Sequence, residues 1–208
     1  MIVLATAPRC KTGSRTHCPR SRWVKVPRQF AWRLPAGFAQ WAAMLELKEL
    51  MLRPPRLTLA VAESLTCGRL QARIGAISGA SNFFLGGITA YQLDQKVKHL
   101  RVDRKEATAV NGVSAIVVEQ MALGACEFFG SDLALATTGY AEPSAEWNVA
   151  QPFAWWGMAH RREAGNFALL SRRVEFPGAS RTTVQEEVAD AALTALVEAL
   201  RGLRQEKK

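Results

Sequence analysis

Short apolar runs alternate with segments of helical spacing between residues 57 and 140, and this alternation limits the possible folds more than any other feature of the chain. The apolar runs lie at 57–62, 83–91 and 132–140, and apolar residues repeat every three or four positions at 70–77, 93–100 and 114–129. A buried strand is a short continuous apolar run, whereas an amphipathic helix repeats its apolar residues with a period near 3.6. Strands that alternate with helices form a largely parallel sheet with helices on both faces.

The pattern changes after residue 152, where two further runs follow one another without a helix between them. The runs at 153–161 and 166–176 are separated by the short turn REAG, which is typical of an antiparallel hairpin. A last helix is expected from about residue 181 to residue 203, because apolar residues again recur there at helical spacing. We therefore predict an α/β fold, a three-layer α/β/α sandwich with a mixed sheet, for residues 57–208.

The positive charge of the chain is concentrated at its N-terminus. The 208 residues carry a formal net charge of +9, and residues 1–43 hold eight basic residues and no acidic one. Removing those eight leaves +1 for residues 44–208, so the rest of the chain is close to neutral. A nearly neutral domain lacks the attraction to phosphates on which nucleic-acid binding depends, and we do not expect a nucleic-acid partner for it.

Residues 1–43 show no sustained helical or strand period and contain four prolines. We predict that they form a disordered basic extension, or that they result from a start assigned too early, with Met44 as the true first residue. An RNA-binding or targeting tail is the alternative, although the prolines disfavour the amphipathic helix of a transit peptide. Residues 44–56 then form a helical lead-in to the first strand.

The cysteines and the apolar runs indicate a protein of the reducing cytoplasm. No Cys-x-x-Cys pair is present, and Cys10, His17 and Cys18 lack a fourth ligand at a recognisable spacing, so we predict neither a metal site nor a cofactor. Cys126 falls on the apolar side of a helix and is expected in the core. No apolar run approaches the roughly eighteen residues that span a bilayer, so we expect no membrane segment.

Polar side chains gather where three of the expected strands end. They lie in residues 63–68 (ESLTCG), 91–96 and 137–143. The carboxyl ends of strands in an open α/β sheet meet at a crevice, and such folds bind small ligands there. Two interpretations of the first turn remain open: Ser64 or Thr66 caps the following helix, or the turn forms one side of a ligand pocket.

These strand ends and the segments between them contain a set of residues in a fixed order and spacing. The set comprises Glu63, Ser64, Thr66, Gly86, Gly87, Tyr91, Lys96, Val113, Ser114, Thr138, Gly139, Ala141 and Pro143, followed by FPG at 176–178 and Arg181. It resembles the C-terminal domain of the competence- and damage-inducible CinA proteins, a family that includes stand-alone nicotinamide mononucleotide deamidases. The resemblance spans about residues 57–203 and implies the fold predicted above.

Two positions depart from the family pattern in the loops that face the expected crevice. Cys67 replaces the first glycine of the family's TGG, so a bulkier residue must enter a turn that favours positive φ. Glu142 replaces the glycine before proline in TG-x-AGP, and its carboxylate would repel a phosphate. We therefore expect phosphorylated ligands to bind less well than they would at a loop without a carboxylate.

The resemblance implies an amidohydrolase that deamidates nicotinamide mononucleotide or a related pyridine amide. Amide hydrolysis needs a nucleophile, a base and donors to the developing oxyanion. We expect Ser64 to act as the nucleophile or to position a water molecule, and Lys96 to act as its base once it is desolvated. Tyr91 would relay or donate a proton. These three residues form the predicted catalytic set.

The predicted ligand-binding set surrounds these three residues and comprises Glu63, Thr66, Gly68, Thr138, Gly139 and Glu142. Thr138 and the backbone N–H groups after Ser64 are the candidate donors to the oxyanion or the ligand, and Glu63 would orient a ribose hydroxyl or the lysine. The partner is then a small, nucleotide-like substrate, and the resemblance implies a homodimer.

A non-catalytic domain is the alternative function. Such a domain would keep the fold and the pocket but bind another nucleotide-like metabolite or a protein partner. The pair Trp155-Trp156 bears on this choice, because neighbouring residues of a strand point to opposite faces of the sheet. One ring should therefore face a helix layer, and the other should lie on the opposite side, where it could stack on a base or on a neighbouring subunit.

Overall fold

The computed structural model describes residues 36–162 and 166–205, with side chains from Met44 onward. In chain order the elements are α1 (Ala36–Leu52), β1 (Leu59–Glu63), α2 (Arg69–Gly75), the 3-10 turn η1 (Ala80–Asn82), β2 (Phe84–Thr89), α3 (Leu93–Leu100), α4 (Arg104–Ala109), α5 (Ala115–Phe129), β3 (Leu133–Tyr140), β4 (Phe153–Arg161), β5 (Phe167–Glu175) and α6 (Arg181–Gln205). The expectations for residues 1–35, including those for Cys10, His17 and Cys18, lie outside the described residues.

The five strands form one mixed sheet in the order β2-β1-β3-β4-β5. β1 pairs in parallel with both β2 and β3, whereas β4 runs antiparallel to β3, and β5 runs antiparallel to β4. β1 therefore has a neighbour on each side, and all five of its residues are buried, which accounts for its continuous apolar run. The predicted mixed sheet and its hairpin are confirmed.

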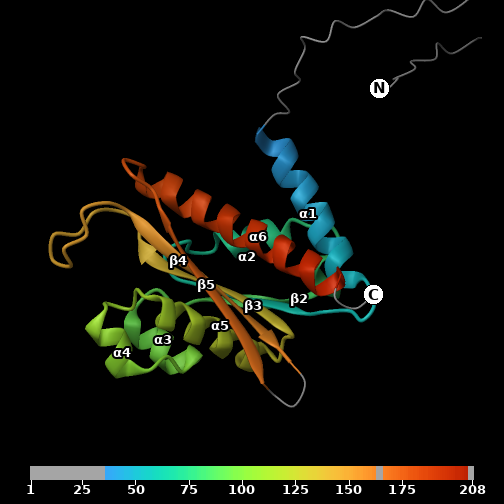
Figure 1. Ribbon diagram of the computed structural model, residues 1–208, viewed down its shortest axis with the longest axis horizontal. Coiled ribbons are helices and arrows are strands. Elements are labelled where there is room, and N and C mark those ends of the chain that lie inside the picture. Colours follow the sequence, from blue (N-terminus) through green and yellow to red (C-terminus); the bar gives the residue numbers. More distant parts are fainter. Residues whose placement is uncertain (1–35, 163–165, 206–208) are drawn as a thin grey trace, which may run out of the picture. The chain divides into compact units, whose positions relative to one another are not determined.

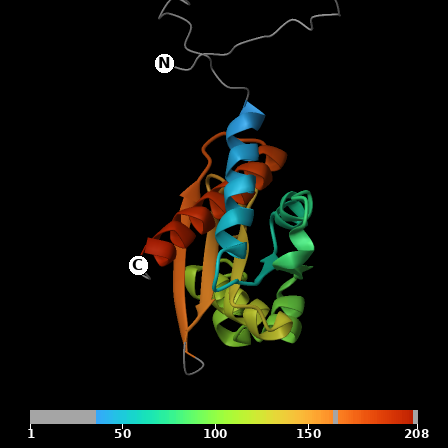
Figure 2. The same ribbon diagram turned by 90° about the vertical axis from the view of Figure 1, so that its right-hand side faces the viewer.

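Helices cover both faces of this sheet, so the predicted three-layer α/β/α sandwich is confirmed. Figure 1 shows α1, α2 and α6 on one side of the sheet and α3, α4 and α5 on the other. In the view of Figure 2 the helix α1 crosses α6, against which it packs. We call the two cores between helices and sheet the α6-side core and the α5-side core.

The two cores use side chains of different size. On the sheet, the α6-side core is built from Leu59, Val61, Leu133, Leu135, Trp156 and Met158, whereas the α5-side core is built from Ala60, Ala62, Ala134, Ala136 and Ala159. Small side chains let α5 lie close to the strands. This closeness appears at Gly157 of β4, where an added Cβ would lie 3.0 Å from the Val118 carbonyl oxygen of α5. Cys126 is buried in this core, as predicted.

The tryptophan pair of β4 divides between the two cores, as the alternation of a strand requires. Trp156 is buried in the α6-side core, whereas Trp155 is partly buried against the α5-side core. Both rings therefore contribute to the packing of the domain.

The N-terminal boundary differs from the prediction. α1 begins at Ala36, so the expected boundary at residue 43 falls inside a helix. Its apolar residues are spread around the whole helix, so no one-sided period marks it in the sequence, and the last of the four prolines immediately precedes it. The second half of α1 belongs to the domain, because Leu47 and Met51 are buried in the α6-side core.

Two further local features differ from the sequence interpretation. The helix α4 was not expected, because it has only six residues; its N-cap is Asp103, whose carboxylate accepts a hydrogen bond from the Glu106 N–H at 2.8 Å. The sequence assigned the pair Gly86-Gly87 no role beyond the family pattern, and in the structure the pair makes room for neighbouring side chains. An added Cβ would lie 3.0 Å from the ring of Phe129 at Gly86 and 2.4 Å from Val61 at Gly87.

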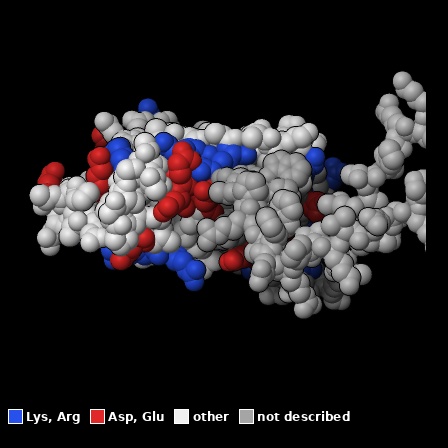
Figure 3. Space-filling view, turned by 90° about the horizontal axis from the view of Figure 1, so that it is seen from above, with Lys and Arg blue, Asp and Glu red and all other residues white. Residues whose placement is uncertain are grey.

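Charges of both signs lie next to one another on the face seen from above in Figure 3. On this side of the domain α2 and α6 are joined by ion pairs, in which Arg69 and Arg73 bind Glu186 and Arg73 also binds Asp190 at 3.0 Å. Paired charges of this kind hold two helices together and leave no broad basic surface on the part of the face drawn in colour. This agrees with the nearly neutral charge of residues 44–208.

Candidate functional site

The polar ends of β1, β2 and β3 lie side by side at one edge of the sheet. The Ser64 N–H donates to the Thr137 carbonyl oxygen at 3.0 Å, and the Ala90 N–H donates to the Glu63 carbonyl oxygen at 2.8 Å. Because β1 lies between β2 and β3, the turn after β1 is flanked by the chain on both sides. The predicted meeting of the three strand ends is thus observed in the backbone.

Glu63 is fully buried, and its carboxylate holds the beginning of α2. Oε2 accepts hydrogen bonds from the Gly68 N–H at 3.0 Å and the Leu70 N–H at 3.1 Å, and Oε1 accepts one from the Gln71 N–H at 2.9 Å. The Thr66 hydroxyl donates to Oε2 at 2.7 Å. A carboxylate placed against free N–H groups at a helix start is strongly stabilised there.

This arrangement decides between the two interpretations of the first turn. The backbone cap residue of α2 is Gly68, and no side chain caps it by a hydrogen bond. Neither Ser64 nor Thr66 therefore caps the helix, because Glu63 binds the free N–H groups instead. The carboxylate oxygens of Glu63, which we expected to orient a ribose hydroxyl or the lysine, are occupied by four donors from its own turn.

The turn between β1 and α2 contains two consecutive residues in the left-handed backbone region. Cys67 has φ of 49° and Gly68 has φ of 95°. Gly68 adopts this conformation at no steric cost, whereas Cys67 adopts it with a side chain that crowds its own backbone. The expected conflict between Cys67 and positive φ is therefore present as local strain, and the turn keeps its geometry despite it.

Lys96 is the second buried charge at this edge, and only 3% of it is exposed. Its Nζ donates to the Gly112 carbonyl oxygen and to Thr138 Oγ1, both at 3.3 Å, and no carboxylate pairs with it among the described residues. Desolvation by burial lowers the pKa of Lys96 to about 8. Roughly a tenth of Lys96 is therefore neutral at pH 7 and about half at pH 8, and only this neutral form can act as a general base.

The turn at Asn111-Gly112 is a part of the site that the sequence did not indicate. The Gly112 carbonyl oxygen accepts hydrogen bonds from Lys96 and, at 2.6 Å, from the Thr138 hydroxyl. Gly112 has φ of 68°, which favours glycine, and an added Cβ would lie 2.9 Å from Lys96 Nζ and displace the lysine. The positive φ preference of an Asn-Gly pair is the one sequence signal that could have marked this turn.

Two polar networks thus occupy opposite faces of the sheet. Thr137 pairs across the sheet with Trp156 of the α6-side core, and its hydroxyl lies 2.7 Å from that of Thr66 in the Glu63 network. Thr138 pairs with Trp155 on the α5 side and contacts Lys96. Ser64 lies at the end of β1 between the two, 6% exposed, and its hydroxyl has no hydrogen-bond partner among the described residues.

A third group of polar residues spans the strand ends on the outside. Arg181, the first residue of α6, donates from Nη2 to the Tyr91 hydroxyl at 2.6 Å and from Nη1 to a Glu142 carboxylate oxygen at 2.8 Å. Tyr91 and Glu142 were both in the predicted set, and Arg181 brings them together. Arg181 was recognised in the sequence only as part of the approach to the last helix, without a role.

Gly139 serves the packing of the sheet. Its φ is 159°, and an added Cβ would lie 2.6 Å from both the Ala154 Cα and the Phe153 carbonyl oxygen. A side chain at this position would collide with the backbone of β4, so the packing of β3 against β4 excludes one.

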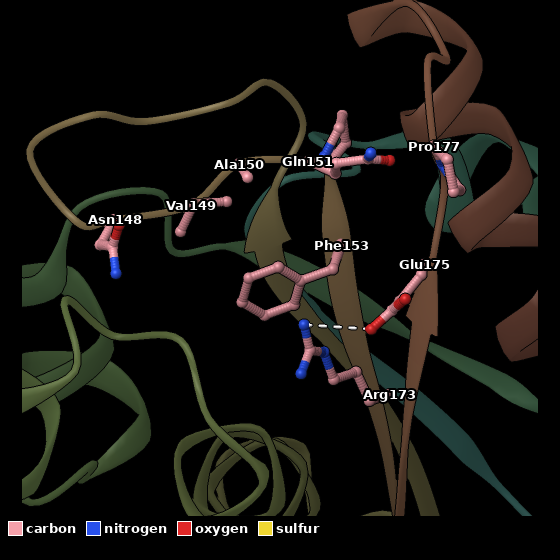
Figure 4. A pocket seen from close by; sticks show the side chains of 9 residues that line it. Asn148, Val149, Ala150, Gln151, Phe153, Arg173, Glu175 and Pro177 are labelled. Carbon is pink, nitrogen blue, oxygen red and sulfur yellow. Dashed lines mark ion pairs between the residues drawn. The ribbon is translucent and has the colours of Figure 1, made fainter.

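A pocket of about 400 Å³ opens at the same edge of the sheet, farther along toward β5. Figure 4 shows Phe153 projecting between the loop at 148–150 and Arg173, whose guanidinium lies 4.1 Å from the ring centre. Arg173 also pairs with Glu175 at 3.2 Å. None of the predicted site residues lines this pocket.

Within residues 36–162 and 166–205, no cluster of three or more His, Cys, Asp or Glu side chains has the geometry to hold a metal ion. No helix in this part of the chain is both long enough and apolar enough to cross a membrane.

The fold and the buried polar groups at its strand ends define an α/β/α domain with a desolvated lysine beside the end of a central parallel strand. Residues 43–200 match the family described as the CinA C-terminal domain, and the chain belongs to this family. A CinA-like protein from Chlorobium limicola is 36% identical over 145 residues, which cover 69% of this chain and 33% of that protein. One from Mycolicibacterium gilvum is 37% identical over 145 residues, covering 70% and 33%. The chain therefore spans about a third of the length of these relatives.

Solved structures with this fold carry the same family description. A competence damage-inducible protein A from Klebsiella pneumoniae superposes with a TM-score of 0.68 at 27% identity, covering 78% of this chain and 97% of that one. A CinA superfamily protein from Escherichia coli superposes with a TM-score of 0.67 at 23% identity, covering 85% and 99%. These similarities confirm the fold and the predicted family.

Proposed function

We propose that the domain is an amidohydrolase in which Ser64 is the nucleophile and Lys96 its base, acting on nicotinamide mononucleotide or a related pyridine amide. One observation carries the proposal: Lys96 is buried at the end of the central strands without a carboxylate partner among the described residues. A cation in such a place destabilises the fold, so a role in catalysis gives a reason for its presence.

In the proposed reaction, neutral Lys96 removes the proton of the Ser64 hydroxyl while Oγ attacks the carboxamide carbon. The resulting ammonium of Lys96 returns the proton to the leaving nitrogen as the C–N bond breaks, and ammonia departs. Water then attacks the acyl group on Ser64, again with Lys96 as base, and the carboxylic acid product and the free hydroxyl are formed.

The N–H groups of Leu65 and Thr66 in the turn after β1, for which no acceptor is described, are the proposed donors to the oxyanion of the tetrahedral intermediate. The hydrogen bonds of Glu63 support this assignment, because they hold that turn in a fixed position. We propose that Thr138 positions Lys96 rather than the ligand, since its hydroxyl contacts Lys96 Nζ and the Gly112 carbonyl oxygen.

A non-catalytic domain that binds a nucleotide-like metabolite is the second candidate. It is favoured by one observation, that no hydrogen bond joins Ser64 to Lys96 among the described contacts. In a hydrolase of this type the two groups come within hydrogen-bond reach at least in the substrate complex.

We further propose that the protein acts in the cytoplasm as a homodimer. The proposed compartment agrees with the two cysteines of the described region, Cys67 and Cys126, which are free thiols. The dimer follows from the family resemblance, and sedimentation of the purified protein would measure it.

Ammonia release from nicotinamide mononucleotide and from its riboside tests the two candidates. The hydrolase should lose activity in Ser64→Ala and Lys96→Met and keep it in Lys98→Met, which removes an exposed lysine from the same helix. The rate should rise with pH around a midpoint near 8, since Lys96 must be neutral to act as base. Binding of either compound without ammonia release would instead support the metabolite-binding domain.

A further inference from the structure

We propose that Glu142 is an internal counter-ion that occupies Arg181 across the end of β1, so that the site prefers the related pyridine amides without a phosphate group, neutral or cationic, to phosphorylated ones such as nicotinamide mononucleotide. This inference rests on the proposed function, because it names the substrate class of the same site. From the sequence we expected an unpaired Glu142 carboxylate to repel a phosphate. In the structure Glu142 is paired with Arg181, so the proposed selection works through this ion pair.

The order of the strands places this ion pair across the strand end that carries the predicted nucleophile. Tyr91 lies two residues beyond β2 and Glu142 two residues beyond β3, while Ser64 follows β1, which lies between them in the sheet. Arg181 contacts both Tyr91 and Glu142. The bridge from Tyr91 through Arg181 to Glu142 therefore crosses the strand end at which Ser64 lies.

Apolar contacts hold the beginning of α6 against the same strand ends. Leu65, the residue after Ser64, and Ala141, the residue before Glu142, are buried in one small cluster with Val184 and Val188 of α6. The first turn of α6, which carries Arg181, is thereby held near the turn after β1 by residues on both sides of the bridge.

The charges of the bridge explain how it selects a substrate. Arg181 is a planar donor that suits a carboxylate or a phosphate, and here its Nη1 donates to Glu142. A phosphorylated ligand must displace Glu142 from Arg181 and remain close to the displaced carboxylate, where like charges repel. A ligand without phosphate leaves the pair intact. Since Glu142 is largely exposed, it can be replaced without opening the core.

Calorimetric binding of nicotinamide mononucleotide and its riboside tests the inference. We expect the intact protein to bind the riboside at least tenfold more tightly than the mononucleotide. Glu142→Gln, which keeps the size but removes the charge, should tighten binding of the mononucleotide at least tenfold and change that of the riboside less than twofold. Glu142→Gln combined with Arg181→Gln should lose this gain, because no cation is left to hold the phosphate.

Glu146→Gln is the matched control, since it removes an exposed carboxylate from the same loop, one without a described partner. An equal gain in Glu146→Gln would overturn the inference, because net charge alone would then set the preference. Tighter binding of the mononucleotide than of the riboside by the intact protein, or no gain in Glu142→Gln, would overturn it as well. All of these results are binding measurements. Failure of the proposed hydrolysis would appear as absent ammonia release, so the two proposals can fail independently of each other.

Discussion

Two buried charges lie at the same edge of the sheet, and the structure treats them in opposite ways. Glu63, on the α6 side, receives four hydrogen bonds from its own turn. Lys96, on the α5 side, has two neutral acceptors at 3.3 Å and no described carboxylate. A buried charge with a full set of partners stabilises a fold, whereas one that lacks a counter-charge destabilises it.

This difference distinguishes a residue that stabilises the fold from a residue that is available for chemistry, although the two looked alike in the sequence. Glu63 ends β1, Lys96 lies in α3 after β2, and both belong to the family pattern, yet the contacts of Glu63 serve the turn and the start of α2. Lys96 is the group whose protonation is free to change near neutral pH, because burial lowers its pKa to about 8. Substitutions that remove each charge should therefore have opposite effects on stability.

Glu63→Ala should have the largest effect. It leaves three backbone N–H groups at the start of α2 without their acceptor, and each unpaired buried donor costs about 1–3 kcal/mol. We expect the free energy of unfolding, measured in urea, to fall by about 3 kcal/mol or more. Glu187→Ala, an exposed carboxylate of α6, is the control and should change stability by less than about 0.5 kcal/mol. Equal effects of the two substitutions would show that the Glu63 network is dispensable.

Lys96→Met should act in the opposite direction and stabilise the protein at pH 7 by up to about 3 kcal/mol, because it removes a charge that is costly to bury. The pKa of Lys96 is lowered on folding from 10.5 to about 8, so the unfolded chain binds the extra proton between these values. The cost is thus fully present below pH 8 and disappears as the pH rises to 10.5. Stability of the unmodified protein relative to Lys96→Met should rise over that window.

Lys98→Met provides the matched control for this pH dependence, since Lys98 is exposed on the same helix. Its unfolding free energy should follow that of the unmodified protein from pH 7 to pH 10.5. If Lys96→Met instead lowers stability at pH 7, the lysine has a counter-charge that the contacts do not reveal, and the contrast with Glu63 fails.

Cys67→Gly should have a smaller effect, a stabilisation of about 1 kcal/mol, because it relieves a side chain held at φ of 49°. Gly68→Ala, at φ of 95°, should destabilise by about 1–2 kcal/mol. An added Cβ at Gly68 meets no atom within 4 Å, so this change measures backbone strain alone. Thermal unfolding would measure the stability of both variants. A loss of stability in Cys67→Gly would mean that the thiol makes a contact whose contribution outweighs the backbone strain.

Ser64→Ala should have the smallest effect on stability, less than about 0.5 kcal/mol, because the Ser64 hydroxyl has no described hydrogen bond. Thr66→Val, two residues away, removes hydrogen bonds to Glu63 and Thr137 and should cost about 1–3 kcal/mol. Urea denaturation would compare them. A large loss in Ser64→Ala would assign that hydroxyl to the turn rather than to a ligand.

The sequence alone determined the architecture of the domain. Alternating apolar runs predicted the parallel strands and their helices, and Ser114 marked the start of α5, where its hydroxyl accepts from the Val117 N–H at 3.1 Å. These features depend on neighbours in the chain, and local patterning is what a sequence displays directly. The order of polar residues at the strand ends likewise indicated the edge of the sheet at which the proposed site lies.

Tertiary structure decided the role and the charge of the polar residues. Glu63 became a helix anchor because α2 turns back over it, and Lys96 became a candidate base because α3 buries it beside the Asn111-Gly112 turn. Arg181 meets Tyr91 and Glu142 from 90 and 39 residues away. Burial and long-range pairing set pKa values and ion pairs, and neither is visible in a sequence until the chain has brought distant segments together.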